Sequence, residues 1–294
     1  MRVVGVEEIL GVSSEVVFDA VKAALVAHAA GDTVVPAPMY LPFAGGDCHV
    51  KAGYVQGQPH FVVKTASSFG GRNTGSMLLL SATTGAPVAM LADNGLLTAW
   101  RTAAAGALIT DALTPSDVDE VAVMGTGEQA RLQMTWLARL RTIRRVHVWG
   151  RRPEAETLLC SQLRADGLEA RPGYQTGAVC VVTTTASPDP LPLAAFRDAV
   201  HVTGIGTDMP GKGELPPELF ADALIVTDDH EQCLDHGDFG HAVRAGVVSA
   251  QADLAAGAVL DGSYRDRRSV ADLTGIGATD ASVAGAVWAL LGVL

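Results

Sequence analysis

A run of small residues behind a short apolar segment is the most specific chemical pattern in this sequence. In "VAVMGTGEQARLQMTWLARL" the apolar segment ends at Met124, and Gly125, Gly127 and Ala130 follow in GxGxxA spacing. This spacing allows a tight turn, then bare backbone beside a pyrophosphate, then a small residue where helix meets strand. A strand before it, a helix after it and a second strand behind it favour a dinucleotide-binding turn over an ordinary strand-to-helix turn. The predicted cofactor-binding residues here and at the end of "VCVVTT" are Gly125, Thr126, Gly127, Glu128, Gln129, Ala130 and Thr184.

The end of the next strand, in "VHVWGRRPE", indicates which dinucleotide is bound. A carboxylate at this place holds the ribose 2'-hydroxyl of NAD, but here Gly150 stands in the acidic position and Arg151 and Arg152 follow. Two guanidinium groups suit a 2'-phosphate, which accepts charge-assisted, bidentate hydrogen bonds. The sequence therefore favours NADP(H). NAD(H) is the alternative, in which the two arginines form only a solvated turn.

A glycine-rich loop, "GTDMPGKGEL", follows the apolar run "AVHVTGI". In open α/β sheets, ligands lie beyond the carboxyl ends of the strands, so this loop is expected to lie over the bound ligand. Pro210 fixes a turn that directs Asp208 into the site. Lys212 and Glu214 are expected to pair with each other or with solvent, and neither is assigned a catalytic role.

Two kinds of pattern divide the chain near Thr114. Before it, a helix capped by Ser13 or Ser14 is followed by four segments typical of strands: "CHVKAGYV", "HFVVKTASSF", "MLLLSA" and "PVAMLAD". An alanine-rich helix, "LLTAWRTAAAGALITDAL", comes next, with Thr98 as its expected cap. This part reads as an α+β domain.

After Thr114, short apolar runs alternate with helical or linker segments: "VAVMG", "VHVWG", "VCVVTT", "VHVTGIG" and "LIVTDD". Strands that are apolar on both faces and separated by helices predict a covered parallel sheet. The expected fold is α/β, with a Rossmann-type doubly wound parallel sheet over 114–273 and an α+β domain over 1–113 plus 274–294. The apolar helix of the tail is expected to pack on the first domain or on a partner subunit.

Composition narrows the function classes. The 294 residues are 48% hydrophobic and 18% charged, with a net charge of -11 and no basic block, so no nucleic-acid-binding surface is expected. No apolar run reaches the roughly 18 residues of a membrane span, and the first residues lack the pattern of a signal peptide. The four cysteines have no CxxC spacing and are expected to be reduced, in a cytoplasmic protein without a metal site.

With these motifs placed, the sequence resembles the ornithine cyclodeaminase/mu-crystallin family over nearly its whole length. The resemblance is carried by "VVKTASSF", "TTGAPVAMLADNGLLTAWRTAAAGA", "GTGEQARLQ", "GIGTDMPGKGEL" and "TGIGATD", in this order. The family includes ornithine cyclodeaminase, archaeal-type alanine dehydrogenase, ketimine reductases and a crystallin that binds NADPH. The resemblance implies a homodimer that joins through the non-Rossmann domain, which also binds the substrate.

Three residues match functional positions of the family. Lys64 in "VVKTAS" matches a lysine that contacts the substrate at the reacting carbon, and Arg101 in "LLTAWRTAA" matches an arginine that binds the substrate carboxylate. Asp208 matches a loop aspartate beside the nicotinamide that acts as general acid/base. Without the resemblance, Arg101 would read as a side chain that reaches solvent from its helix.

The sequence departs from the family pattern at one cationic position. Many members have an arginine in a pattern like "vpqRv", where this chain has "VVPAPMYLP" with Pro38. A subgroup carries a lysine in a pattern like "HIKYGY", and Lys51 in "CHVKAGYV" matches it. Lys51 is therefore a candidate substrate-binding cation, with an ordinary edge-strand charge as the alternative.

Together these features predict an NAD(P)H-dependent reductase of α-imino acids, such as cyclic ketimines, or an amino-acid dehydrogenase running the same chemistry backwards. One alternative is an ornithine cyclodeaminase-type ammonia lyase that recycles bound NAD. A second is a crystallin-like protein that binds NADPH without turnover. The predicted catalytic residues are Lys64 and Asp208, and the predicted substrate-binding residues are Lys51 and Arg101.

Overall fold

The computed structural model describes residues 1–173 and 179–291, and the chain divides into two compact units. Unit 1 comprises Met1–Ala105 with Gly275–Leu294, and unit 2 comprises Gly106–Thr274. The division falls inside helix α3 (Leu96–Leu113), whereas the sequence placed it after that helix. Residues 292–294 of the predicted first domain lie outside the described residues. Within the described residues, no helix has the length and apolar character needed to cross a bilayer.

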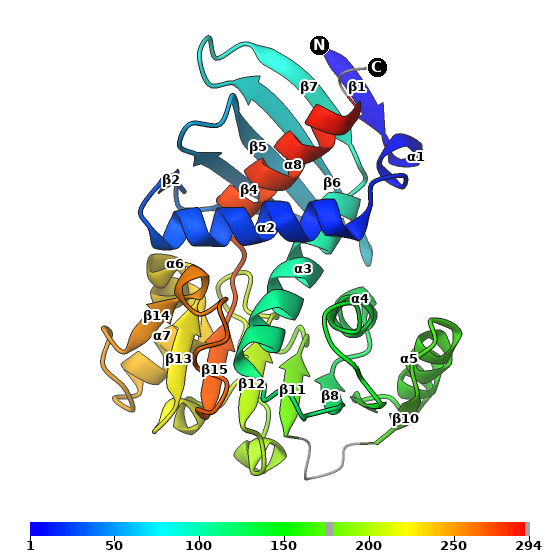
Figure 1. Cartoon of the computed structure of the whole chain (residues 1–294), viewed down its shortest axis with the longest axis vertical. Coiled ribbons are helices and arrows are strands. Elements are labelled where there is room, and N and C mark those ends of the chain that lie inside the picture. Colours follow the sequence, from blue (N-terminus) through cyan, green and yellow to red (C-terminus); the bar gives the residue numbers. More distant parts are fainter. Residues whose placement is uncertain (174–178, 292–294) are drawn as a thin grey trace. The chain divides into compact units, whose positions relative to one another are not determined.

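Unit 1 contains a seven-stranded sheet that is antiparallel except for its β1–β7 pair (Figure 1). The strand order is β1-β7-β6-β5-β4-β2, and β3 also pairs with β4. Its strands are β1 (Arg2–Gly5), β2 (Thr33–Val34), β3 (Met39–Phe43), β4 (Gly46–Val55), β5 (His60–Phe69), β6 (Arg72–Ser81) and β7 (Pro87–Ala92). Because successive side chains of a strand point to opposite faces, each long strand presents one row of side chains to the core.

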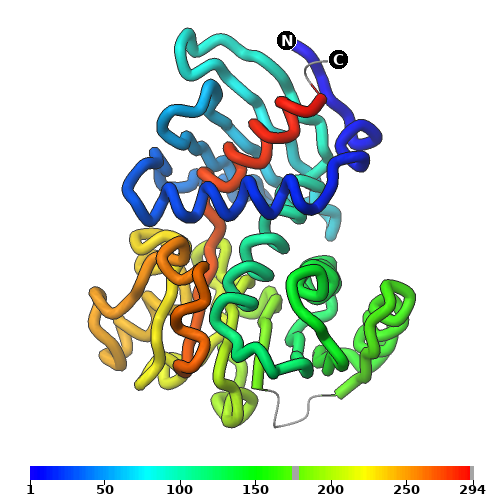
Figure 2. Tube along the Cα trace, in the orientation of Figure 1, coloured from blue at the N-terminus to red at the C-terminus, as the bar shows by residue number. Residues whose placement is uncertain are grey.

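Helices α1 (Val6–Ile9), α2 (Ser14–Ala29) and α8 (Gly277–Leu291) also belong to unit 1. The buried side of α2 contains the apolar stripe predicted from sequence: Val17, Val21, Ala24 and Leu25, together with Phe18. Helix α8 packs against α2, β4 and β5, and Figure 2 shows this C-terminal helix in red beside the blue α2. The prediction that the apolar tail returns to the first domain is therefore confirmed.

The start of α3 differs from the prediction that Thr98 caps it. The helix begins at Leu96, and Asp93 Oδ2 accepts a hydrogen bond of 2.7 Å from the backbone N of Leu97. Asn94 and Gly95 between them have positive φ, at 55° and 88°. The Thr98 prediction is wrong because the tight turn at Asn94–Gly95 lets an aspartate four residues upstream supply the cap.

Unit 2 contains an eight-stranded sheet in which every described pair is parallel, as predicted. The strand order is β10-β9-β8-β11-β12-β15-β13-β14, with the sequence order reversing on either side of β8. The strands are β8 (Glu120–Met124), β9 (Arg145–Trp149), β10 (Ala170–Pro172), β11 (Cys180–Thr183), β12 (His201–Gly204), β13 (Leu224–Thr227), β14 (Asp253–Ala255) and β15 (Ser269–Asp272). Such a reversal is where ligands bind in doubly wound sheets.

Helices and short 3-10 turns connect these strands. They are α4 (Glu128–Leu137), α5 (Pro153–Ala165), α6 (His230–His236), α7 (Asp238–Arg244), η1 (Leu193–Phe196), η2 (Pro217–Phe220) and η3 (Ala256–Ala258). A core cluster packs Phe196, Phe220 and Phe239 from these connections against Val181 and Val202 of the sheet. The four-residue strands β11, β12, β13 and β15 are buried along their whole length, which explains their continuous apolar runs.

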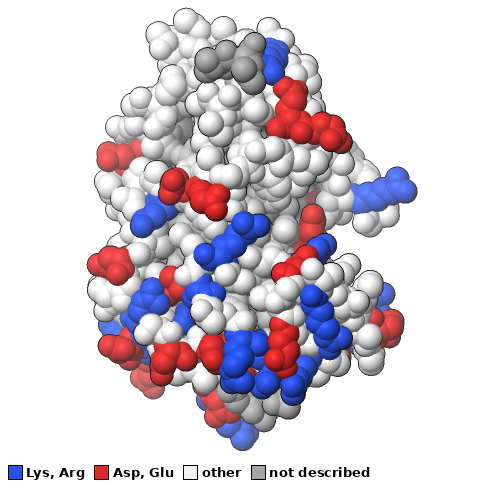
Figure 3. All heavy atoms as spheres, turned by 45° about the vertical axis from the view of Figure 1, so that its right-hand side comes forward, with Lys and Arg blue, Asp and Glu red and all other residues white. Residues whose placement is uncertain are grey.

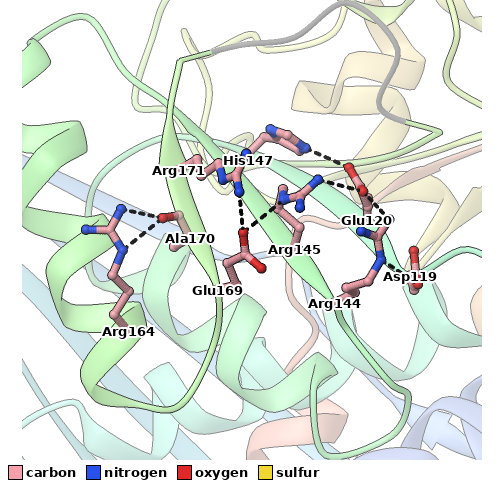
Figure 4. A network of polar contacts seen from close by, with 9 residues as sticks. All are labelled: Asp119, Glu120, Arg144, Arg145, His147, Arg164, Glu169, Ala170 and Arg171. Carbon is pink, nitrogen blue, oxygen red and sulfur yellow. Dashed lines mark hydrogen bonds and ion pairs between the residues drawn. The ribbon is translucent and has the colours of Figure 1, made fainter.

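Charged side chains of both signs are interspersed over unit 2 on the face shown in Figure 3. Figure 4 shows one such network, which joins the starts of β8, β9 and β10. Arg145 of β9 contacts Glu120 of β8 at 3.0 Å and Glu169, just before β10, at 3.2 Å, and His147 contacts Glu120 at 3.0 Å. Exposed ion pairs contribute about 0–1 kcal/mol each. The network therefore adds little stability. Its contacts join the starts of the three strands, at the end of the sheet opposite the glycine turn.

The closest approach in unit 1 joins β4 to the start of α8. A Cβ added at Gly277 would lie 1.9 Å from the carbonyl oxygen of Ala52, and one added at Gly53 would lie 2.1 Å from the Gly277 carbonyl. Only hydrogen fits at both positions. This contact brings the first turn of α8 directly onto the sheet.

We therefore expect Gly277→Ala to lower the free energy of unfolding by about 1–3 kcal/mol or more, because it forces two backbone segments apart. Gly285→Ala is the matched control in the same helix, since an added Cβ there meets nothing within 4 Å. That change should stabilise the helix by roughly 0.5–1 kcal/mol. Urea unfolding of both variants measures the difference, and equal effects would contradict the close approach.

Candidate active site

Two lysines occupy facing positions on neighbouring strands of unit 1. Lys51 of β4 is directly opposite Lys64 of β5 in the antiparallel register. Both side chains are buried, at 5% and 2% exposure, and Lys64 lies on the same face of β5 as the buried Val62. Like charges directly opposite each other destabilise a sheet, and buried charges are costly unless they are paired. These positions therefore require an anion close by.

Asp280, in the first turn of α8, is that anion. Its Oδ2 lies 3.0 Å from Lys64 Nζ, and its Oδ1 accepts a hydrogen bond of 2.9 Å from Arg101 Nε. The aspartate is fully buried and Arg101 is 6% exposed. The structure thus brings together Lys51, Lys64 and Arg101, all three predicted from sequence, with Asp280. These four residues are called the Asp280 cluster below.

The protonation states in the cluster follow from burial and charge. Burial lowers the pKa of Lys64 to about 7, with Arg101 and Lys51 lowering it further and Asp280 opposing them. Burial alone raises the pKa of Asp280, but Arg101 and Lys64 together hold it below its ordinary value. The aspartate is therefore ionised, while the Lys64 amine gains or loses a proton near neutral pH. A group poised in this way suits general acid–base chemistry.

Arg101 keeps part of its guanidinium available for a ligand. Its contact with Asp280 uses Nε, and within residues 1–173 and 179–291 its two terminal nitrogens have no hydrogen-bond or ion-pair partner. Gly275 has a φ of 80°, and a Cβ there would lie 2.7 Å from Arg101 Nη1. The Gly275 carbonyl accepts a hydrogen bond of 2.7 Å from Lys51 Nζ. The loop before α8 therefore supports both cations and leaves a planar fork that matches a carboxylate.

In unit 2, the predicted nucleotide turn connects β8 to α4. Gly125 has a φ of 133°, and a Cβ there would lie 2.2 Å from Thr184 Oγ1, so only glycine fits. Gly127 is the N-terminal cap residue of α4, forms no side-chain cap, and would place a Cβ in open space. Ala130 is fully buried. No side chain therefore occupies the cap position at the start of α4, which fits the approach of a dinucleotide pyrophosphate to this helix N-terminus.

The residues after β9 also fit the predicted cofactor. Gly150 has no carboxylate for a ribose hydroxyl, and a Cβ there would lie 2.5 Å from Thr126 Cγ2, so a larger residue would require the Thr126 side chain to move. Arg151 and Arg152 are exposed at the start of α5. Within the part of the chain that the structure describes, neither guanidinium forms a hydrogen bond or ion pair. The Glu156 carboxylate accepts a hydrogen bond of 2.8 Å from the Gly150 backbone N.

Asp208 lies in the loop after β12 of unit 2, with 47% of its side chain exposed. Lys212 Nζ contacts its Oδ1 at 2.6 Å. The prediction that Lys212 and Glu214 pair with each other or with solvent is wrong, because Lys212 pairs with Asp208 and Glu214 is fully buried. The tight turn brings residues four apart into contact, while hydrogen bonds from four donors hold the Glu214 carboxylate inside the fold. The proton-transfer role of Asp208 stays a prediction.

The comparison with known proteins agrees with this arrangement. The profile of the ornithine cyclodeaminase/mu-crystallin family matches residues 2–289. The chain belongs to this family. It is 30% identical over 295 residues to an alanine dehydrogenase of Archaeoglobus fulgidus, covering 94% of this chain and 90% of that one. It is 34% identical over 221 residues to an iminosuccinate reductase of Paracoccus denitrificans, covering 72% and 69%.

Solved structures of this family share the fold. An archaeal alanine dehydrogenase dimer with bound NAD superposes with a TM-score of 0.88 at 27% identity, covering 100% of this chain and 97% of that one. The iminosuccinate reductase of P. denitrificans in complex with NAD+ gives a TM-score of 0.88 at 27% identity, covering 99% and 96%. Both neighbours combine a parallel-sheet fold like this one with a bound nicotinamide nucleotide.

Asp280 is the residue of the cluster that the sequence analysis did not assign, although it lies in the family segment "TGIGATD". A signal for it exists in the sequence. It is a lone carboxylate in the otherwise apolar helix "GATDASVAGAVWALL", and a buried carboxylate needs a cationic partner. The identity of its cationic partners depends on contacts across 216 positions of sequence for Lys64 and 179 for Arg101.

The pH dependence of stability reports on Lys64. Its pKa is 10.5 when unperturbed and about 7 in the folded protein, so between these values the unfolded chain binds more protons. The free energy of unfolding should therefore rise with pH from 7 to 10.5, by at most about 5 kcal/mol. Lys64→Met should lose this rise, whereas the control Lys22→Met, at an exposed site on α2, should keep it. Urea unfolding at several pH values measures it, and parallel curves for Lys64→Met and wild type would refute the assignment.

Proposed function

We propose that this chain is an NAD(P)H-dependent reductase of α-imino acids. The observation that carries the proposal is the Asp280 cluster, a buried group of cations in which the terminal nitrogens of Arg101 are available for a carboxylate. Family membership supplies the reaction class, because the relatives include an iminosuccinate reductase and an alanine dehydrogenase. Reduction of the C=N bond adds one hydride and one proton, and the reduced nicotinamide supplies the hydride when it is bound.

The side chains of the cluster divide the remaining work. Arg101 binds the substrate carboxylate through its two terminal nitrogens, and the Lys51 ammonium adds a second positive charge. The Lys51 ammonium is oriented by its hydrogen bond of 2.7 Å to the Gly275 carbonyl. Binding of the carboxylate fixes the positions of the imine carbon and nitrogen, so the reacting C=N bond is held in one orientation. Asp280 keeps both Lys64 and Arg101 in place.

Lys64 and Asp208 are the proposed proton-handling groups. A Lys64 pKa of about 7 allows its Nζ to be protonated or neutral at physiological pH, so it can donate a proton to the imine nitrogen. Asp208 supplies a second exchangeable carboxylate from the loop after β12. Lys212 Nζ lies 2.6 Å from its Oδ1 and orients it.

We propose that the chain prefers NADPH and also accepts NADH. The two neighbours described above contain NAD, and a glycine turn of the kind in this chain serves either nucleotide. In this chain, Gly150 offers no ribose-binding carboxylate, and the exposed guanidinium groups of Arg151 and Arg152 favour a 2'-phosphate.

We also propose a homodimer formed through unit 1. One archaeal neighbour is a dimer. In unit 1, edge strand β3 exposes Met39 and Phe43, at 57% and 54%, and the Phe43 ring packs against Phe69 with centroids 5.6 Å apart. An apolar edge strand of this kind is normally covered in a soluble assembly.

The function is tested by following NADPH oxidation with purified protein and a panel of imino acids, including cyclic ketimines and iminosuccinate. We expect turnover with at least one α-imino acid and none with imines that lack the carboxylate, because the Asp280 cluster needs an anion. Arg101→Ala should lower kcat/KM by about 10²-fold or more, as loss of a bidentate carboxylate contact implies. Ammonia release from ornithine without net nucleotide change would instead identify a cyclodeaminase. Tight NADPH binding with no turnover in either assay would identify a binding protein.

The cofactor preference is tested with the double variant Arg151→Ala/Arg152→Ala. Removing two charge-assisted contacts to the 2'-phosphate should weaken NADPH by about 10- to 10²-fold, while NADH affinity changes little. Fluorescence titration with each nucleotide measures both constants. Arg139→Ala, which changes an arginine of the same unit outside the predicted site, is the control. Equal weakening of NADPH and NADH would remove the argument for NADPH.

A further inference from the structure

Glu214 is a fully buried carboxylate that lies beneath the loop carrying Asp208. It accepts hydrogen bonds from four donors, three on Oε2 and one on Oε1. The Oε2 donors are Thr183 Oγ1 at 2.9 Å, the Ile205 backbone N at 3.1 Å and the Gly206 backbone N at 2.6 Å. The Oε1 donor is the backbone N of Thr185. A carboxylate with this many donors is held in one orientation.

These donors belong to two segments that leave neighbouring strands. Thr183 and Thr185 lie at and after the end of β11, and Ile205 and Gly206 follow the end of β12, its parallel neighbour. A Cβ at Gly206 would lie 2.1 Å from the Thr185 carbonyl oxygen and 2.5 Å from Glu214 Cδ. The two segments therefore meet on this single carboxylate with no space between them.

The segments held by Glu214 also carry Thr184, a predicted cofactor-binding residue, and Asp208, a predicted catalytic residue. Thr184 lies between two of the contacts, and its backbone N donates to the Met124 carbonyl at 2.7 Å beside the glycine turn. On the other side, Thr207 Oγ1 donates to Asp272 Oδ1 at 2.9 Å, and Asp208 is the next residue. Glu214 is itself fixed through its backbone N, which lies 3.0 Å from Asp238 Oδ1.

We propose that Glu214 is a positioning residue: its carboxylate holds the segments after β11 and β12 in one arrangement, and so sets the backbone that carries Thr184 and Asp208. The inference rests on the proposed function for the roles of those two residues, and on the observed hydrogen bonds for the arrangement itself. Glutamate is required because it offers two oxygens and no donor. A glutamine offers one oxygen, and its NH2 group would face at least one N–H or O–H donor.

The protonation of Glu214 gives this arrangement a pH dependence. Burial raises the pKa of Glu214 to about 7, with Thr185 opposing the shift and Asp238 reinforcing it. Asp238 in turn lies 3.5 Å from His241 of α7, and its charge raises the pKa of Asp272 of β15. As pH falls through about 7, a proton on Glu214 removes an acceptor site and introduces a donor. Nucleotide affinity should therefore weaken on the acid side.

The test compares Glu214→Gln with Glu218→Gln, an exposed glutamate four residues later. In the nucleotide-free protein, we expect amide hydrogen exchange of Glu214→Gln to be about 10-fold faster or more over residues 184–186 and 205–208. NADPH affinity, measured by fluorescence titration, should fall about 10-fold, and its acid-side weakening near pH 7 should disappear. Glu218→Gln should behave as wild type in all three measurements.

Asp208→Asn separates positioning from proton transfer. That variant should lose turnover while keeping exchange rates and NADPH affinity, whereas Glu214→Gln should change all three. If Glu214→Gln lowers only the melting temperature and leaves local exchange and NADPH affinity unchanged, the proposal is overturned. If it does not fold, Thr183→Val removes a single donor and should weaken NADPH in the same direction, by about 3-fold; no change there overturns the proposal as well. Exchange and NADPH affinity decide the role of Glu214 even if no imino acid is reduced.

Discussion

The sheet of unit 1 depends on one ion-pairing constraint: Lys51 and Lys64 lie opposite each other on buried strands, and Asp280 compensates them. Two ammonium groups at facing positions repel each other, and the repulsion is strong in a low-dielectric interior. The aspartate reaches them because Gly53 and Gly277 allow the start of α8 to touch β4. The glycines and the buried charges are thus parts of one arrangement, since a side chain at either glycine would move the carboxylate away from its cations.

Unit 2 also depends on a buried carboxylate, but this carboxylate satisfies hydrogen-bond donors of the backbone and not cationic side chains. At the carboxyl ends of β11 and β12, the backbone N–H groups of Thr185 and Gly206 have no strand partner within the described residues, and an unsatisfied buried donor costs about 1–3 kcal/mol. Glu214 accepts from these donors. A carboxylate held by fixed dipoles cannot easily reorient. The rigidity of the loop before Asp208 therefore follows from hydrogen-bond satisfaction, and the glycines in it serve to admit the carboxylate closely.

The sequence predicted what depends on local spacing. The GxGxxA turn and the apolar strands of the parallel sheet each follow from residues within a short segment, and the structure has them. Three other features depend on distant contacts. Asp93 replaced Thr98 as the cap of α3 because the turn geometry at Asn94–Gly95 is not evident from helix propensity. The roles of Asp280 and Glu214 depend on which strands become neighbours, so their partners were visible only in the fold.

The charge balance of the Asp280 cluster also limits what it binds. With Lys64 neutral above a pH of about 7, Lys51 and Arg101 face one compensating carboxylate, and one positive charge is left over within the cluster. A single substrate carboxylate neutralises that excess. Protonation of Lys64 adds a second positive charge. In the proposed reaction, transfer of this proton to the imine nitrogen removes that charge from Lys64. Buried charge without compensation is costly, so the cluster is more stable with an anion bound than without one. That difference favours binding of a carboxylate. It favours most a carboxylate whose neighbouring nitrogen can take the proton.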